Sequence, residues 1–241
     1  MKFQLFEGQQ RSPEWFKLRR GRVSSSRLGD WMATSKAKGK EGQPLKARKD
    51  YEKELMFEKQ FDVNYDFYVS EPMQDGIDYE AFALQEYERI TGNSVEEVGG
   101  WYSERFFSST DGEVTEKGKK KPEGISEVKI LRDNSWTDLL DKHEPKHEHI
   151  LQMQGGLLSS KHKWCDYIAL HLKTKRILII RVKADKELMK EIEESLKVDL
   201  SVEPYDLTGV YEFQEAIPED QLSAPIQNQA QKNESDILKE F

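Results

Sequence analysis

FFSSTDGEVTEKGKKKPEGISEVKI, residues 106–130, contains the pattern from which the fold follows. It predicts a strand that ends at Asp111, a lysine-rich excursion, and a second strand that carries Glu127 and Lys129. Residues two apart in a strand point to the same face, so Glu127 and Lys129 should stand side by side. If the two strands pair as a hairpin, Asp111 comes close to both.

Two carboxylates that converge on one point repel each other unless a cation lies between them, and oxygen ligands suit Mg²⁺ or Mn²⁺. A neighbouring lysine can hold a water molecule or a phosphate oxygen, which completes a minimal site for phosphodiester hydrolysis. The pattern alone is weak, because a similar acid-x-lysine triplet occurs at residues 144–146. The alternative is a charged hairpin without chemistry.

The composition indicates a soluble protein, with 34% charged and 36% apolar residues in a chain of 241. There is no apolar run of about eighteen residues, so we expect no membrane span. The first ten residues, MKFQLFEGQQ, lack the apolar core of a signal peptide. The single Cys165 excludes an intramolecular disulfide and a four-cysteine cluster. These features predict a cytoplasmic protein.

The net charge of −8, from 37 basic and 45 acidic residues, argues against a protein that simply coats DNA. It remains compatible with a nuclease that has a local basic channel. The basic residues are clustered in residues 36–49 and 117–121.

The amino-terminal region predicts a helix that begins after Ser12, with Pro13 in its first turn, and ends at Gly21. A serine-rich turn, residues 24–26, then precedes a second helix over residues 27–34. The start of a helix with serine hydroxyls is a natural anion site. Ordinary helix capping is the alternative.

Apolar periodicity predicts the remaining elements. Further helices are expected over residues 45–61, 75–91, 146–158 and 186–196, and strands over residues 95–102, 104–109, 164–172 and 176–183. In the helix over residues 75–91 we expect Ile77, Phe82, Leu84 and Tyr87 in the core. In the helix over residues 146–158, the pair Gly155-Gly156 permits another backbone to approach closely. This order predicts an α/β sheet flanked by helices. Residues 1–214 should form a single domain, and the polar residues 215–241 a flexible tail.

Four segments, in order, resemble the lambda-exonuclease or YqaJ-type viral recombinase family of the PD-(D/E)XK nuclease superfamily. They are EWFKLRRGRVSSSRL, DYEAFALQEYERITG, SSTDG followed by SEVK, and ILQMQ, and they span residues 15–185. The resemblance implies a restriction-endonuclease-like core, with a central mixed sheet between helices.

The resemblance also implies roles for particular residues. Asp111, Glu127 and the Val128 carbonyl would bind metal, Lys129 would position the attacking water, Gln152 would lie beside the metal, and Glu80 would contact a metal-bound water. Arg19, Ser24, Ser26 and Ser109 would hold a terminal 5′-phosphate, and the loop with Lys36, Lys38 and Lys40 would touch DNA. For Arg19 the alternative is a favourable interaction with the helix dipole. The sixteen positions between Asp111 and Glu127 exceed the family's usual hairpin, which leaves the partner of Asp111 less secure.

The activity implied is that of a Mg²⁺-dependent 5′→3′ exonuclease on double-stranded DNA, using one or two ions, with Mn²⁺ able to substitute. It would release 5′-mononucleotides and leave 3′ overhangs for recombination by strand annealing. The resemblance further implies a homotrimeric ring and a single-strand annealing partner. The alternatives are a RecB-like or restriction-type endonuclease and a catalytically silent DNA-binding scaffold. The single cysteine excludes the iron–sulfur branch of the RecB-like group.

Overall fold

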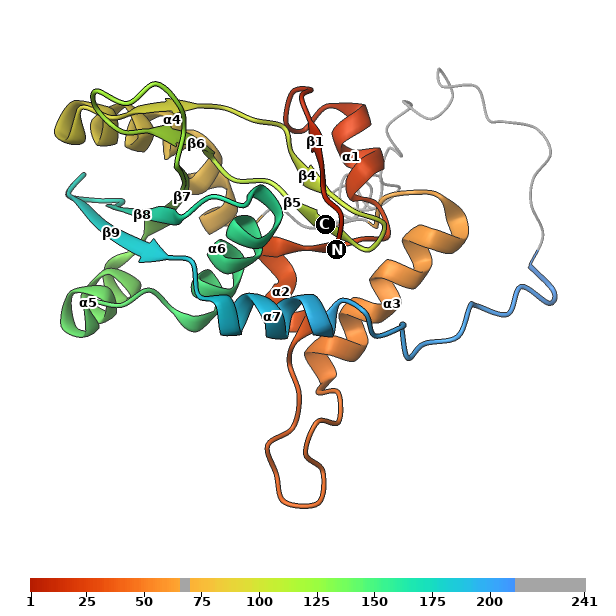
Figure 1. The fold of residues 1–241 in the computed structure, drawn as a ribbon. Coiled ribbons are helices and arrows are strands. Elements are labelled where there is room, and N and C mark those ends of the chain that lie inside the picture. Colours follow the sequence, from red (N-terminus) through yellow and green to blue (C-terminus); the bar gives the residue numbers. More distant parts are fainter. Residues whose placement is uncertain (66–69, 211–241) are drawn as a thin grey trace, which may run out of the picture. The chain divides into compact units, whose positions relative to one another are not determined.

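The computed structural model describes residues 1–65 and 70–210, which contain two mixed β-sheets and the helices around them (Figure 1). The helices are α1 (Pro13–Arg19), α2 (Leu28–Trp31), α3 (Lys46–Phe61), α4 (Glu71–Thr91), α5 (Asp133–Lys142), α6 (His147–Ser160) and α7 (Lys186–Ser195), with a 3-10 helix, η1 (Ser25–Arg27). The strands are β1 (Gln4–Phe6), β2 (Val23–Ser24), β3 (Ser94–Glu96), β4 (Gly100–Tyr102), β5 (Phe106–Ser108), β6 (Gly112–Thr115), β7 (Gly124–Leu131), β8 (Trp164–His171) and β9 (Ile177–Lys183). Residues 1–205 pack as one compact unit.

The larger sheet has the order β3-β6-β7-β8-β9, with β7 and β8 parallel and all other neighbours antiparallel. Helix α4 covers one face, where Tyr87 packs in one cluster with Val128. Helices α5 and α6 cover the other face, where Met153 packs in one cluster with Ile125 (Figure 1). Because side chains alternate along a strand, Glu127 shares the face of Ile125 and points toward α6.

The smaller sheet has the order β1-β4-β5-β2. On one face, the Trp15 ring of α1 meets Phe107 edge-on, with 5.1 Å between ring centroids. On the other face, Phe106 packs in one cluster with Leu28 of α2 and Leu151 of α6. Helix α6 therefore packs against both sheets and joins them.

Two adjacent glycines allow α6 to approach its neighbours, as the sequence predicts. A Cβ atom on Gly155 would lie 2.6 Å from Leu28 Cδ1, and one on Gly156 would lie 2.9 Å from Ile125 Cδ1. Both distances are too short for any side chain.

The hairpin differs from the expectation in one respect. The strand before Asp111, β5, belongs to the smaller sheet, so it does not pair with the strand that carries Glu127. That strand, β7, pairs instead with β6, which begins directly after Asp111, in the register Gly112↔Ser126. The additional residues of the long hairpin lie at its far end, beyond the Val114↔Gly124 pair.

The strand expected over residues 95–102 is wrong as a single element, since it splits into β3 and β4, which lie in different sheets. The break falls at Gly99, where a Cβ atom would lie 2.2 Å from the Gly8 carbonyl oxygen. The chain changes sheets at this close backbone contact.

The helix expected over residues 75–91 begins earlier, at Glu71, and presents a different face to the core. Ala83 and Tyr87 are fully buried, whereas Ile77 and Phe82 remain 44% and 39% exposed, so their predicted core positions are wrong. The buried face of α4 is centred on Ala83 and Tyr87, with Leu84 partly buried beside them.

Helix α5 was not predicted, because only Trp136 and Leu139 of its ten residues are buried and the apolar pattern is too short to detect. The helix expected over residues 27–34 is shorter than predicted, since α2 ends at Trp31. In the part of the chain that the structure describes, no helix is long and apolar enough to cross a membrane. The predicted domain boundary at residue 214 and the flexible tail, residues 215–241, lie outside the described residues.

Candidate active site

Asp111 lies where the chain passes from the smaller sheet to the larger one, between β5 and β6. Its backbone N–H donates to the Ser126 carbonyl at 3.1 Å, which extends the β6–β7 ladder by one residue. Its carboxylate accepts a 2.5 Å hydrogen bond from the Val128 N–H. Asp111 is thereby held next to Glu127, although sixteen positions separate the two residues in the sequence.

Glu127 is buried on β7, with only 5% of its side chain exposed. Its Oε1 atom lies 2.5 Å from Lys129 Nζ and accepts a 2.6 Å hydrogen bond from Gln152 Nε2. Lys129 reaches it along the same strand face, and Gln152 reaches it from α6. Lys129 and Gln152 therefore contact the same carboxylate oxygen of Glu127.

Glu80 adds a third acidic side chain to this region, from α4. Burial, and then the negative charge of Asp111, raise the pKa of Glu80 to about 7. Burial also raises the pKa of Asp111, with a further contribution from Glu127, and it raises the pKa of Glu127. Each of these shifts means that the negatively charged form is disfavoured, because buried carboxylates converge without enough positive charge nearby.

Lys129 supplies part of that positive charge. Burial alone would lower its pKa, but the carboxylates of Glu127 and Asp111 outweigh this effect and raise it. The amine is therefore held as an ammonium ion beside the two acids.

The donor set fits a divalent cation of the Mg²⁺ type. The candidate ligands are the carboxylate oxygens of Asp111 and Glu127 and the backbone carbonyl of Val128, and hard cations prefer such oxygen ligands. Mg²⁺ usually keeps several water ligands as well. Within residues 1–65 and 70–210, no three His, Cys, Asp or Glu side chains are arranged as a complete metal site. Two carboxylates and one carbonyl suit an ion whose remaining ligands are water and substrate.

Three of the residues predicted to hold a 5′-phosphate meet where the end of α1 approaches β2 and η1. The Arg19 guanidinium, at the end of α1, lies 3.4 Å from Ser24 Oγ, and the hydroxyls of Ser24 and Ser26 are 3.2 Å apart. Ser24 pairs with Phe107 in the parallel register of β2 and β5, and Ser109 lies just beyond the end of β5. The structure thus brings Arg19, Ser24 and Ser26 together, whereas no hydrogen bond in the described chain links Ser109 to them.

A cavity of about 590 Å³ opens beside these residues. Arg19 and Ser26 line it together with Arg27 and Tyr51. Arg27 is neutralised by Asp30 and Glu54 and lies 4.2 Å above the Tyr51 ring, measured from its guanidinium carbon to the ring centroid. Arg19, in contrast, forms no ion pair with any described carboxylate, and burial lowers its pKa.

Residues 14–163 match the family profile of the YqaJ-like viral recombinase domain, which is more than half of the chain. The chain belongs to the YqaJ-like viral recombinase family. The predicted family and fold class are confirmed.

Solved structures with the same fold include the alkaline exonuclease LHK-Exo from Laribacter hongkongensis. It is 28% identical, with a TM-score of 0.64 over 77% of this chain and 89% of that one. Its complex with dAMP gives 27% identity and a TM-score of 0.63, with the same coverage. A phage-related exonuclease from Haemophilus somnus 129PT is 18% identical, with a TM-score of 0.58 over 73% and 90% of the two chains, and at that identity the similarity concerns the fold alone. A search of curated proteins finds no significant match.

The lysine-rich loop of this YqaJ-like domain lies apart from the carboxylates. Lys36, Lys38 and Lys40 are exposed on a finger between α2 and α3, which Figure 1 shows extending away from both sheets. Its base is closed by hydrogen bonds from Ser35 N–H to the Gln43 carbonyl and from Leu45 N–H to the Ala33 carbonyl, at 2.8 and 3.0 Å.

Sequence reasoning missed three residues of the site. Arg27 and Tyr51 line the cavity, and Arg11 forms an ion pair with Glu80, with 3.8 Å between Nη2 and Oε2. Arg27 could have been found, since it follows the serine-rich turn directly. Tyr51 and Arg11 lie near the site only through contacts between distant segments, so the sequence carries no local signal for them.

Proposed function

We propose that this protein is a Mg²⁺-dependent exonuclease that degrades the 5′ strand of double-stranded DNA from its end, releases 5′-mononucleotides and leaves a 3′ overhang. The family and the exonucleases of similar structure support a nuclease function. The observation that carries the proposal is the convergence of Glu80, Asp111 and Glu127 with Lys129 and Gln152.

Each side chain has a defined task in this mechanism. Asp111, Glu127 and the Val128 carbonyl would hold the ion, which activates water and stabilises negative charge on the phosphate. Lys129 would orient the attacking water, because its ammonium group is fixed against Glu127. Gln152 would keep Glu127 in one rotamer, and Glu80 would accept a hydrogen bond from a water molecule at the site.

The cavity lined by Arg19 and Ser26 supports action at DNA ends. Only a terminus presents a phosphomonoester. An arginine that forms no ion pair with any described carboxylate, next to two serine hydroxyls, suits such a group. The relative that binds dAMP shows that a protein of this fold can hold a nucleoside monophosphate. We propose that Arg19, Ser24, Ser26 and Ser109 bind the 5′-phosphate of the strand being degraded.

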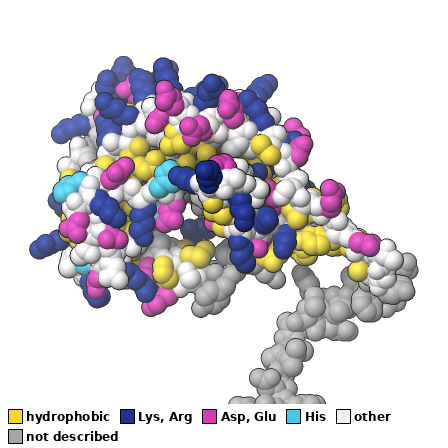
Figure 2. All heavy atoms as spheres, turned by 90° about the horizontal axis from the view of Figure 1, so that it is seen from below, with side chains coloured by type: hydrophobic (Ala, Val, Ile, Leu, Met, Phe, Trp, Pro, Cys, Tyr) yellow, Lys and Arg dark blue, Asp and Glu magenta, His cyan; other side chains and the backbone are white. Residues whose placement is uncertain are grey.

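The family resemblance extends the proposal to assembly. We propose a homotrimeric ring around DNA, acting with a single-strand annealing protein in the cytoplasm, and a DNA contact through the Lys36–Lys40 finger. A ring could place basic residues toward DNA and acidic ones outward. Figure 2 shows one face of the chain, on which basic and acidic side chains are interspersed rather than segregated.

Digestion of end-labelled duplexes tests the function. Linear DNA with a 5′-phosphate should be degraded to labelled mononucleotides in Mg²⁺, while circular DNA should persist. Asp111→Asn should abolish digestion and leave end binding measurable. Cleavage of the circular substrate would favour the endonuclease alternative, and the absence of metal-dependent digestion would favour the silent scaffold.

A further inference from the structure

Arg11 occupies a position that would suit glycine. The Ser12 N–H donates to the Gln9 carbonyl at 3.4 Å, which closes a turn with Arg11 at its third residue, and Arg11 has a φ of 62°. Glycine is the usual residue for a positive φ in such a turn, because a Cβ atom is strained there.

The other non-glycine residues with positive φ in the described chain have local explanations. Asp62, His143 and Lys161 end helices α3, α5 and α6, and Lys175 lies in the turn between β8 and β9. Arg11 likewise lies in a turn, from Gln9 to Ser12, but its side chain also reaches Glu80 of the candidate site. An arginine at a turn position that favours glycine suggests that its side chain has a function.

The turn is anchored next to the active site. Gln10 Nε2 donates to the carbonyls of Val98 and Thr110, each at 2.8 Å, and Thr110 immediately precedes Asp111. On the other side, Ser12 Oγ accepts a 3.2 Å hydrogen bond from the Trp15 N–H at the start of α1. These contacts fix the backbone of Arg11 relative to the strand that leads into the carboxylate site.

The Arg11 guanidinium lies beside the carboxylates of the candidate site and is exposed enough to contact a substrate. It is 3.8 Å from Glu80 Oε2, and its positive charge also acts on Asp111. Its side chain is 54% exposed and forms no hydrogen bond with any described residue. Lys129, in contrast, is held against Glu127. Arg11 is therefore a cation, paired with Glu80 at 3.8 Å, whose N–H groups have no hydrogen-bond partner among the described residues and can meet an incoming anion.

We propose that Arg11 is a catalytic residue that donates hydrogen bonds to a non-bridging oxygen of the scissile phosphodiester and stabilises the negative charge that builds up there during hydrolysis. Guanidinium groups match phosphate oxygens in shape and charge, and such donors act most strongly where charge develops in the transition state. The inference rests on the proposed nuclease function and adds a substrate contact that the family match does not supply.

Arg11→Gly tests the proposal, because it removes the guanidinium and also relieves the turn. We expect single-turnover digestion of 5′-phosphorylated duplex to slow by about 10²-fold, with a Tm that is unchanged or higher. Arg11→Lys should retain an intermediate rate. Lys161→Gly is the matched control, since it relieves a φ of 63° at the end of α6 and should digest DNA at the wild-type rate.

An Arg11→Gly variant within about threefold of wild type would overturn the proposal, provided that the wild type digests DNA. If the wild type showed no metal-dependent digestion, the proposed function itself would be wrong, which is a different result. A large loss of Tm in Arg11→Gly would also contradict the argument, because it would make Arg11 a structural residue.

A double-mutant cycle with Glu80→Gln separates contact with the substrate from an effect through Glu80. If Arg11 contacts phosphate, Arg11→Gly should still slow digestion in the Glu80→Gln background, although the contact between the two residues makes their losses less than fully multiplicative. If Arg11→Gly causes no further loss in the Glu80→Gln background, Arg11 acts only by positioning Glu80 and the proposed contact is wrong. Anisotropy of a labelled DNA end in EDTA gives a second readout, in which Arg11→Gly should weaken binding.

Discussion

Gln152 of α6 donates a 2.6 Å hydrogen bond to Oε1 of Glu127 on β7, the same oxygen that Lys129 contacts. This bond joins a helix that packs against both sheets to the centre of the candidate site. It leaves Oε2 of Glu127 as the oxygen that is free of both partners.

Gln152→Ala should therefore impair activity more than stability. We expect digestion to fall by about 10- to 100-fold and the Mg²⁺ requirement to rise, because Glu127 loses the contact that orients it. Titrations of initial rate against Mg²⁺ concentration would measure both effects. An unchanged Mg²⁺ dependence would contradict this role of Gln152.

Gln154 is the matched control, two residues along α6. It is buried, donates to the Lys183 carbonyl at 2.8 Å and accepts from the Asp185 N–H at 2.9 Å. Gln154→Ala should lower the free energy of unfolding by about 1–3 kcal/mol, because it removes two partly buried hydrogen bonds, each worth about 0.5–1.5 kcal/mol. Its Mg²⁺ dependence should stay that of the wild type.

Arg19→Gln should remove the preference for phosphorylated ends. The Arg19 guanidinium lies beside Ser24 and forms no ion pair with any described carboxylate, and glutamine cannot attract a dianion in the same way. Rates on otherwise identical duplexes with 5′-phosphate and 5′-hydroxyl ends would be compared. We expect the wild type to favour the phosphate by about tenfold or more and the variant to treat both alike. A preference that survives the substitution would place the phosphate elsewhere.

The part of this architecture that follows from sequence is local. Strand alternation places Glu127 and Lys129 on one face, and the serine-capped start of α1 needs only neighbouring residues. The division of residues 94–108 between two sheets could not be predicted, because it depends on contact between Gly99 and Gly8, ninety-one positions apart. Arg11 was missed for the same reason, since its turn is held by Gln10 through the distant Thr110 carbonyl.

Arg181 should stabilise the fold through its ion pair with the buried carboxylate of Asp166. Asp166 is 2% exposed and accepts hydrogen bonds from Arg181 Nε and Nη2 at 2.8 and 2.9 Å, and from the Tyr87 hydroxyl at 2.6 Å. The Arg181 guanidinium also lies 3.5 Å above the Trp164 ring centroid. Arg181→Gln leaves the Asp166 charge buried without its cation, so we expect a loss of about 3 kcal/mol in unfolding free energy.

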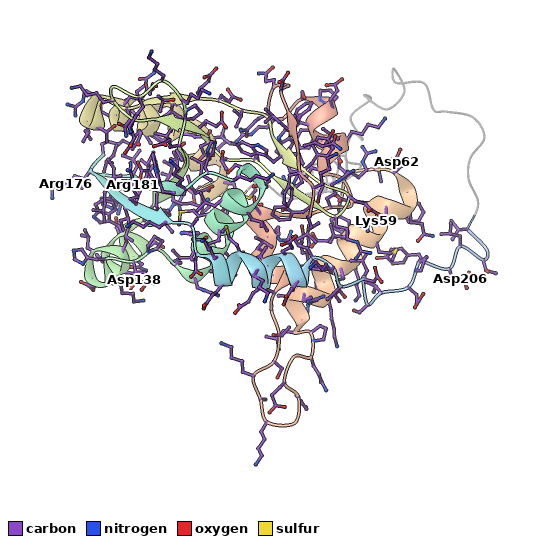
Figure 3. All side chains as sticks on the ribbon, viewed as in Figure 1. Lys59, Asp62, Asp138, Arg176, Arg181 and Asp206 are labelled. Carbon is purple, nitrogen blue, oxygen red and sulfur yellow. The ribbon has the colours of Figure 1, made fainter. Side chains whose placement is uncertain are left out.

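The exposed Arg176, which directly precedes β9, provides the control, and Figure 3 labels it on the same side of the molecule as Arg181. Arg176→Gln should change unfolding free energy by less than about 0.5 kcal/mol. Urea unfolding of both variants would give the two values. Equal losses in the two variants would mean that Asp166 does not depend on Arg181.

His149 should make the protein less stable in acid. Its Nδ1 lies 2.9 Å from the Tyr167 hydroxyl, and burial, followed by the charges of Lys129 and Lys146, lowers its pKa to about 3. In the unfolded chain the imidazole takes up a proton near pH 6.5, whereas the folded protein keeps it neutral. The unfolded state therefore binds more protons between these values, and stability falls as the pH decreases from about 6.5 towards 3.

His149→Gln should reduce this pH dependence. One group can contribute at most about 1.4 kcal/mol per pH unit, so the stability difference between pH 7 and pH 5 should shrink by up to about 2 kcal/mol. The exposed His147, two residues earlier, is the control, and His147→Gln should behave as the wild type. Urea unfolding at the two pH values would decide the matter, because the carboxylates that titrate in the same range are common to all three proteins. A pH dependence that is identical in His149→Gln and wild type would show that His149 is protonated in the folded state as readily as in the unfolded one.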